Sequence, residues 1–194
     1  MQIKKEELRQ QILDAAQVEF LKKGYENSSL RVIAKKANTT LGNIYHYFPS
    51  KEALLIELCS PVLTMMASLA ANHFDEEERI HSLEEIDLAL MDMEQFWEED
   101  NIKCILDQRL LIILDLKTTA LAAEKDWFIQ KFKDHIRWHL NLDKHDDSYA
   151  SIIVHMFIDC IRHVLLEQQN PNQAKEEFIK VFRMLCTGIV SNDD

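Results

Sequence analysis

The side chains best suited to binding chemistry lie between residues 28 and 51, a stretch with four basic residues and no Asp or Glu. These basic residues are Arg31, Lys35, Lys36 and Lys51. Guanidinium and ammonium groups pair with phosphate, and Arg and Asn side chains can also form hydrogen bonds with base edges in the major groove of DNA. The residue types therefore suit contact with a polyanion such as DNA.

The charge of the chain is divided unevenly, although the total is -11. Residues 1–60 carry nine Lys and Arg against seven Asp and Glu, a net charge of +2, whereas residues 61–194 have a net charge of -13. Phosphate repels an acidic surface, so the N-terminal part is the only plausible contact surface for DNA. The acidic remainder can equally serve solubility.

Two short helices joined by a polar turn are expected to position these residues. Ser28 or Ser29 can cap the first helix, and Asn38-Thr39-Thr40 forms the turn. Thr40 can cap a second helix over Leu41–Tyr47, whose Ile44 and Phe48 lie one turn apart and should face the core. This pattern predicts a helix-turn-helix whose second helix enters a major groove.

Lys51 follows this helix in an unusual place. Pro49-Ser50 should end the helix, and Ser50 should cap the next one, which puts Lys51 in a first helical turn. Negative charge is preferred there, because the helix dipole is positive at its N-terminus. A nearby phosphate would account for the misplaced cation.

The composition as a whole predicts an all-α protein. Only 3 Gly and 3 Pro occur in 194 residues, and long runs place apolar residues at helical spacing. About nine helices are expected, over residues 4–23, 30–37, 41–47, 51–72, 82–99, 102–115, 119–142, 147–169 and 172–187.

Other chemistry has little support in the sequence. The four cysteines form no C-x-x-C pair, and no nucleophile motif or glycine-rich phosphate loop is present, so we expect no metal, no cofactor and no enzyme. The longest apolar run, Leu110–Leu114, has five residues. Since that is far too short to span a membrane, we expect a soluble, cytoplasmic protein.

Residues 6–66 resemble the DNA-binding domain of the tetracycline-repressor (TetR) family of bacterial transcription regulators. The block GNIYHYFPSKEALL, from Gly42 to Leu55, carries the most specific part of the resemblance. Matching positions upstream are Arg9, Ile12, Ala15, Ala16, Phe20, Gly24, Tyr25, Ser29, Ile33, Ala34 and Ala37. Asn38 replaces the glycine usual in the turn but tolerates a left-handed backbone, and Thr39 replaces a usual hydrophobic residue.

The resemblance implies two domains with different functions. Residues 6–66 would form the DNA-binding domain, with the helix-turn-helix at about 29–48, and residues 67–194 would bind an effector and dimerise. The positions that match DNA-contacting residues of the family are Arg31, Thr40, Leu41, Gly42, Asn43, Tyr45, His46, Tyr47 and Lys51. Among them, Asn43 suits adenine and Arg31 suits guanine, whereas Leu41 can either contact a thymine methyl group or pack internally.

Two further sets of residues are candidates in the C-terminal part. An apolar effector pocket between helices could be lined by Met66, Phe96, Trp97, Trp127, His135 and His139. Core packing is the alternative for each of these side chains, and His135 and His139, four residues apart, lack a third metal ligand. The last two helices are apolar enough to form a subunit interface, through Ile153, Phe157, Ile161, Phe178, Phe182 and Leu185.

These features together predict a ligand-responsive transcriptional regulator. We expect a homodimeric repressor that binds a palindromic operator in double-stranded DNA and is released by a small-molecule effector not yet identified. The alternative is a regulator that binds DNA constitutively without a ligand.

Overall fold

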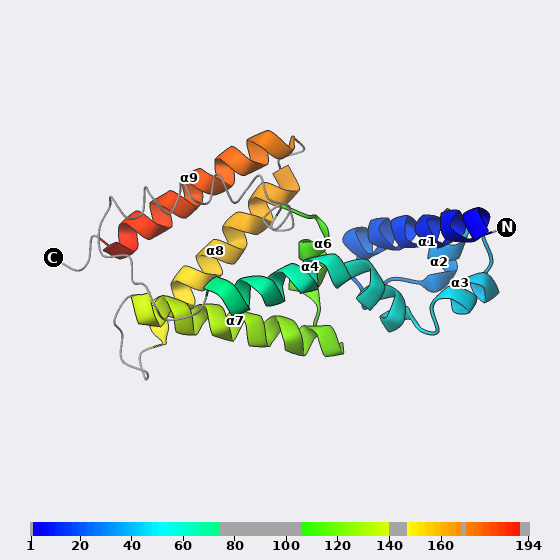
Figure 1. Cartoon of the computed structure of the whole chain (residues 1–194), viewed down its shortest axis with the longest axis horizontal. Coiled ribbons are helices and arrows are strands. Elements are labelled where there is room, and N and C mark those ends of the chain that lie inside the picture. The colour runs from blue at the N-terminus through cyan, green and yellow to red at the C-terminus, as the bar shows by residue number, and fades with distance from the viewer. Residues whose placement is uncertain (1, 74–105, 140–146, 168–169, 191–194) are drawn as a thin grey trace. The chain divides into compact units, whose positions relative to one another are not determined.

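The computed structural model describes residues 2–73, 106–139, 147–167 and 170–190. Within these residues the chain forms eight α-helices and no strand, so the predicted all-α fold is confirmed (Figure 1). The helices are α1 (Gln2–Lys23), α2 (Leu30–Lys36), α3 (Leu41–Tyr47), α4 (Lys51–His73), α6 (Arg109–Asp115), α7 (Ala120–His139), α8 (Ser148–Glu167) and α9 (Pro171–Val190). The helix expected over residues 82–99 lies outside the described residues.

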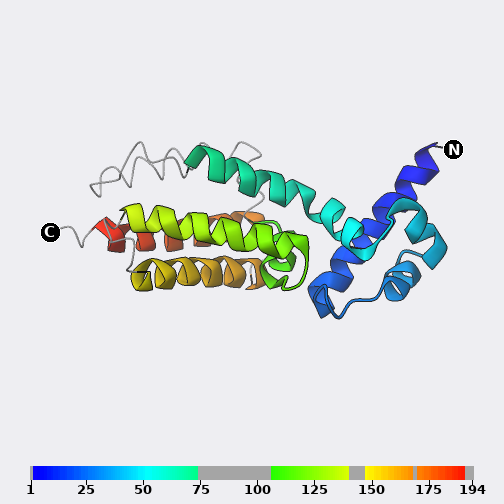
Figure 2. The same cartoon turned by 90° about the horizontal axis from the view of Figure 1, so that it is seen from below.

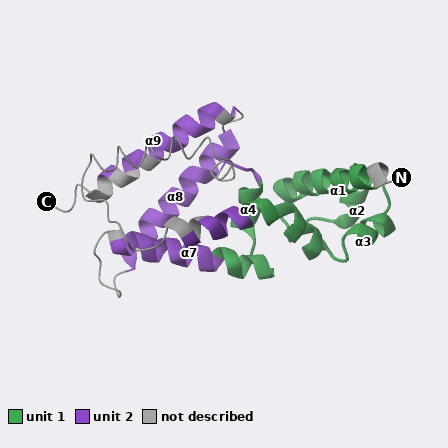
Figure 3. Cartoon of the chain, in the orientation of Figure 1, with its two compact units in different colours: residues 1–63, 109–125 green, residues 64–108, 126–194 purple. Residues whose placement is uncertain are grey.

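The chain divides into two compact units (Figure 3). One comprises residues 1–63 and 109–125, and the other comprises residues 64–108 and 126–194. The division within α4 falls close to residue 66, where the sequence suggested a domain boundary. However, α6 and the first turns of α7 join the N-terminal unit, although they lie far beyond that boundary in the sequence.

The core around α1, α2 and α3 is built from one face of each of these helices. Ile12 and Phe20 of α1, Ile33 of α2 and Ile44 of α3 are at most 1% exposed. Phe48, which follows α3, is also buried, so the inward orientation predicted for Ile44 and Phe48 is confirmed. Full burial of such a side chain contributes roughly 1.5–3 kcal/mol to stability, so this small core holds α3 firmly in place.

Two left-handed residues end the first two helices. Gly24, with φ at +73°, follows α1, and its N–H donates to the Phe20 carbonyl at 2.8 Å. Asn38, with φ at +48°, follows α2. Its N–H donates to the Lys35 carbonyl at 3.2 Å, and the N–H of Thr39 donates to the Ala34 carbonyl at 2.9 Å. This pair of bonds is a Schellman motif, which fixes the direction in which the chain leaves α2.

Ion pairs add to the packing of α1. The Lys36 ammonium lies 2.8 Å from the carboxylate of Glu19, whose side chain is only 7% exposed. A buried carboxylate without a partner would be costly, so Lys36 stabilises Glu19, and the pair links α2 to α1. Arg9 pairs with Glu57 of α4, and its guanidinium lies 5.7 Å from the centre of the Phe48 ring.

The segment that leads into α7 is bound to the same unit by two carboxylates. Glu26 accepts hydrogen bonds from the Lys117 N–H at 3.0 Å and the Thr118 hydroxyl at 3.4 Å. Glu52 accepts one from the Ala120 N–H at 3.1 Å, at the open N-terminus of α7. Partial burial acts to raise the pKa of Glu26, but these hydrogen bonds outweigh it and lower the pKa. Their contribution to stability is therefore present above the ordinary carboxyl pKa and is lost as the pH falls through the lowered value.

In the second unit, α7, α8 and α9 run up and down as neighbours (Figures 1 and 2). Phe157 of α8 contacts Phe132 of α7 and Phe178 of α9, with ring centres 5.1 and 5.8 Å apart. At the start of α8, the Asp147 carboxylate pairs with Lys133 at 2.8 Å and with Arg137. Hydrogen bonds from these two cations lower the pKa of Asp147.

One described helix, α8, is long and apolar enough to cross a membrane by length and composition alone. The core helix of a soluble protein meets the same criterion. Asp159, Arg162 and His163 interrupt the apolar sequence of this continuous helix, which is why the sequence shows no long uninterrupted apolar run there.

The left-handed turn at Asn38 leads to a first prediction. We expect Asn38→Ala to lower the free energy of unfolding by about 1 kcal/mol relative to Asn38→Gly, because a Cβ is disfavoured at positive φ and glycine lacks one. Urea denaturation of the full chain would measure the difference. Equal stability of the two variants would contradict the role assigned to this turn.

Candidate nucleic-acid interface

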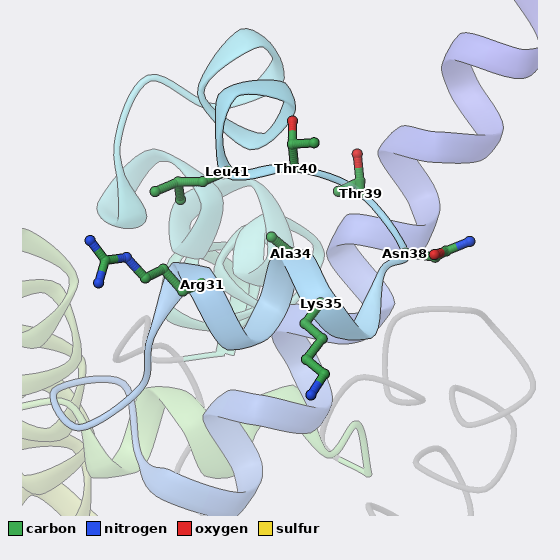
Figure 4. Close-up of a pocket in the computed structure, with 7 residues that line it drawn as sticks. All are labelled: Arg31, Ala34, Lys35, Asn38, Thr39, Thr40 and Leu41. Atoms are coloured by element: carbon green, nitrogen blue, oxygen red, sulfur yellow. The ribbon is translucent and has the colours of Figure 1, made fainter.

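An open groove of about 580 Å³ lies where α2, the turn and the start of α3 meet (Figure 4). The residues that line it are Arg31, Ala34, Lys35, Asn38, Thr39, Thr40 and Leu41. Arg31 and Leu41 extend toward the same side of the groove, whereas Asn38 points the other way. The structure thus brings together three of the predicted DNA-contacting residues, namely Arg31, Thr40 and Leu41.

The outer face of α3 carries further predicted residues. Ile44 is fully buried, whereas Gly42, Asn43, Tyr45 and His46 are exposed, and Tyr45 is 51% exposed. Because Ile44 faces the core, these four residues must project away from it. The predicted cap of α3 is confirmed, since the Thr40 hydroxyl accepts a hydrogen bond from the Asn43 N–H at 3.2 Å.

The glycine on this face has open space around it. A Cβ at Gly42 would approach only the Thr40 hydroxyl oxygen, at 3.8 Å, which is ordinary van der Waals contact. The fold of this unit therefore does not require glycine at this position. A missing side chain does allow another backbone to approach closely, as a DNA strand would.

Aromatic side chains border the same face. The His46 and Tyr47 rings meet edge to face with centres 5.5 Å apart. Tyr47 is half-buried, and the centre of its ring lies 6.0 Å from the Lys5 ammonium. A tyrosine hydroxyl or imidazole at the edge of such a surface can donate a hydrogen bond to phosphate.

Lys51 has a different environment from the one that its sequence position suggested. Its ammonium donates to three backbone carbonyls of the turn between α1 and α2, and it lies 4.4 Å from the centre of the Tyr25 ring. The acceptors are Tyr25 at 2.7 Å, Ser28 at 3.1 Å and Glu26 at 3.4 Å. An ammonium has three donors, so these carbonyls use all of them. Burial lowers the pKa of Lys51, while the Glu26 carboxylate acts in the opposite direction.

The internal role of Lys51 accounts for its place in a first helical turn without any phosphate. Its contact with DNA stays a prediction, and that contact would require the ammonium to give up at least one carbonyl. Lys36, paired with Glu19, is likewise occupied. The exposed cations of α2 that face the groove are Arg31 and Lys35.

The residues suggested for an effector pocket lie in varied surroundings. Met66 is buried, whereas Trp127 is 54% exposed, with the Lys131 ammonium 5.9 Å from its ring centre. His135 stacks on Trp138 with ring centres 6.1 Å apart. Phe96, Trp97 and the side chain of His139 lie outside the described residues, so the pocket stays a prediction.

The residues suggested for a subunit interface are largely used inside the second unit. Phe178 and Ile161 are buried, Phe157 packs between two other phenylalanines, and Ile153 packs against a cluster around Ile136. The side chains of Phe182 and Leu185 are not among those described. A separate cavity of about 270 Å³ is lined by Asp159, Cys160, His163, Val164, Glu177 and Val181.

Four residues of the groove are not among the predicted DNA contacts, namely Ala34, Lys35, Asn38 and Thr39. Thr39 has a specific contact there, since its hydroxyl accepts a hydrogen bond from the Asn43 side-chain amide at 3.0 Å. The two residues are four apart, which is the spacing at which neighbouring side chains meet on a helix. This spacing could have predicted the Thr39–Asn43 contact, but Thr39 precedes the helix and the sequence placed it only in the turn.

The geometry defines the class of this unit, which is a helix-turn-helix of the kind that binds DNA. Residues 12–58 match the family model described as bacterial regulatory proteins, tetR family. This segment of the N-terminal unit is therefore similar to the N-terminal part of bacterial regulatory proteins of the tetR family.

Similar proteins agree with this assignment. The transcriptional repressor KstR of Mycolicibacterium smegmatis is 44% identical over 50 residues, which cover 26% of this chain and 24% of that protein. An uncharacterized HTH-type regulator of Haemophilus influenzae is 29% identical over 137 residues, covering 70% and 66%. The chain thus spans only about a quarter of KstR.

A solved structure shows the same fold over nearly the whole chain. The TetR-family regulator PfmR of Thermus thermophilus has a TM-score of 0.51 and 18% identity, covering 93% of this chain and 97% of that one. At this identity the likeness concerns the fold alone.

The position of Lys51 leads to a second prediction. We expect Lys51→Met to lower the free energy of unfolding by about 1–3 kcal/mol, because three carbonyls lose a charged donor. Lys35→Met, which changes an exposed lysine on α2, is the matched control and should stay within about 0.5 kcal/mol of the wild type. Urea denaturation measures both. Unchanged stability of Lys51→Met, together with weaker DNA binding, would restore phosphate as the partner of Lys51.

Proposed function

We propose that this protein is a transcriptional repressor that binds a palindromic operator as a homodimer and is released by a small-molecule effector. The observation that carries the proposal is the exposed face of α3, which continues into the groove lined by Arg31, Lys35 and Thr40. That surface combines hydrogen-bonding side chains with positive charge, and the stretch that forms it contains no carboxylate. A cytoplasmic location follows from this function.

Each residue of the surface has a suitable partner on DNA. Arg31 can take guanine bidentately, and Asn43 can donate to and accept from adenine. Leu41, half-buried at the groove, can offer apolar contact to a thymine methyl group. Tyr45, His46 and Tyr47 would contact the phosphate backbone, which sets the register of α3 in the groove.

The charge distribution supports binding through this end of the chain. Contacts with phosphate release counterions, so affinity for DNA should fall steeply as salt rises. Two copies related by a twofold axis would read half-sites whose centres lie about one helical turn, or somewhat more, apart. An absence of salt-dependent binding by the purified protein would overturn the proposal.

Gly42 allows a direct test of DNA approach. We expect Gly42→Ala to keep or raise stability, by up to about 1 kcal/mol, since alanine favours helix and its Cβ meets no obstacle. The same Cβ would obstruct close approach of DNA and lower operator affinity about tenfold, the size of one good contact. Thermal unfolding and DNA binding by fluorescence anisotropy measure the two effects. Unchanged affinity would remove Gly42 from the interface.

An exposed apolar stripe on α8 supports the homodimer. Tyr149, Ile152, Met156 and Leu166 are between 46% and 63% exposed. Together with Asp159 and His163 they alternate at spacings of three and four residues, as in the contact seam of two packed helices. We therefore place the interface on this stripe, because four of the residues first suggested for it, Ile153, Phe157, Ile161 and Phe178, already pack within the unit.

The stripe gives a fourth prediction. We expect Ile152→Glu to convert the dimer to a monomer, because a buried carboxylate without a partner is strongly unfavourable. Val18→Glu on α1 is the matched control, since both side chains are 55% exposed in one chain. Analytical ultracentrifugation gives the oligomeric state. A dimer that persists in Ile152→Glu would exclude this stripe.

Effector binding is supported by the resemblance to TetR-family regulators and by the connectivity of the helices. Both α4 and α7 continue from one compact unit into the other, so a change in the second unit has two covalent helical routes to the first. A metabolite that raises the melting temperature and releases operator DNA would identify the effector. A regulator that binds constitutively would show neither response.

A further inference from the structure

We propose that Thr39 is a positioning residue that orients the Asn43 carboxamide for reading a base, most suitably adenine. The inference rests on the proposed DNA-binding function. It starts from the hydrogen bond that the Asn43 amide nitrogen donates to the Thr39 hydroxyl oxygen, at 3.0 Å.

The position of Thr39 is itself determined by the end of α2. Its N–H donates to the Ala34 carbonyl at 2.9 Å, and it follows the left-handed Asn38. These are features of a Schellman motif, so the backbone of Thr39 is anchored to a helix whose Ile33 and Ala34 lie in the core. The backbone that carries the Thr39 hydroxyl is therefore anchored to α2.

Asn43 is held at a second point by the neighbouring threonine. The Thr40 hydroxyl accepts a hydrogen bond from the Asn43 backbone N–H at 3.2 Å, as the cap of α3. Two consecutive hydroxyls thus hold the backbone and the side chain of one exposed residue. A solvent-exposed asparagine otherwise turns freely and loses that freedom when it binds.

The hydrogen bond to Thr39 leaves the right groups for base readout. A carboxamide has two N–H donors and one carbonyl acceptor, and Thr39 uses one donor. One donor and the acceptor remain, which match the N7 acceptor and the N6 amino donor of adenine in the major groove. Pre-organisation of the amide would add to both affinity and discrimination.

Thr39 also differs from the hydrophobic residue usual at this place in the TetR family. In a Schellman motif this position commonly makes an apolar contact with the helix that it ends. Thr39→Val would supply that type of residue at nearly constant volume, so the variant should fold. In this structure the Thr39 hydroxyl instead accepts a hydrogen bond from the Asn43 side-chain amide.

The test compares Thr39→Val with Thr39→Ser, which keeps the hydroxyl. The operator would first be selected from random double-stranded DNA, and the base read by Asn43 would be located with Asn43→Ala. Binding constants would then be measured for operators carrying each of the four base pairs at that position. We expect Thr39→Val to lose about threefold to tenfold in discrimination at that one position, and Thr39→Ser to keep it.

A double-mutant cycle separates positioning of Asn43 from any direct contact of Thr39 with DNA. If Thr39 acts through Asn43, Thr39→Val should have no further effect on discrimination in the Asn43→Ala background. Equal discrimination by Thr39→Val and the wild type, or an equal loss in both backgrounds, would overturn the proposal.

A measurement without DNA distinguishes failure of this inference from failure of the proposed function. In the free protein, ¹⁵N relaxation of the Asn43 side-chain NH₂ group should report an ordered amide in the wild type and a mobile one in Thr39→Val. An amide equally mobile in both would overturn the positioning role even where DNA binds. Absence of DNA binding by the wild type would overturn the proposed function, and with it the base-reading role.

Discussion

The left-handed backbone at Asn38 is the constraint on which the candidate DNA-binding surface, formed by the groove and the outer face of α3, depends. With φ at +48°, this residue ends α2 and turns the chain so that Thr39 and Thr40 lie at the start of α3. Thr40 then caps α3, and Thr39 holds the Asn43 side chain. A different turn would move the whole outer face of α3 relative to Arg31 on α2. Two backbone hydrogen bonds and one positive φ thus define the geometry of the candidate interface.

Around this turn the first unit is held by several independent contacts. The buried side chains of α1, α2 and α3 form a common core, and the Glu19–Lys36 pair joins α1 to α2. Lys51 holds the turn between α1 and α2, and Glu26 and Glu52 hold the segment before α7. These carboxylates are thus engaged with internal partners, while the stretch from residue 28 to 51 contains none. In a protein of net charge -11, this stretch thus keeps Arg31 and Lys35 exposed at the groove without a carboxylate of its own.

In the second unit the apolar side chains of α8 serve two purposes. One face packs against α7 and α9 through residues such as Val154 and Phe157. The opposite face leaves Tyr149, Ile152 and Met156 exposed, which suits contact with a second subunit. The apolar residues of this helix therefore form both a core face and an outer stripe. Composition alone could not separate them, because both faces have the same residue types.

The sequence by itself determined the described helices, the side-chain caps at Thr40 and Ser50 and the inner face of α3, because these depend on residues at most a few positions apart. The cap at Thr40, the left-handed Asn38 and the buried Ile44 are all local consequences of this kind. The side-chain cap expected at Ser28 or Ser29 is not formed, since Ser29 precedes α2 without a side-chain cap hydrogen bond. Only the tertiary structure decided what Lys51 contacts, since its three carbonyl acceptors lie 23 to 26 residues away. It also decided that residues 109–125 join the first unit, where Glu26 bonds to a backbone N–H 91 residues further along the chain. Helical periodicity carries no information about such distant pairs, because it records which side of a helix is apolar and not what covers that side.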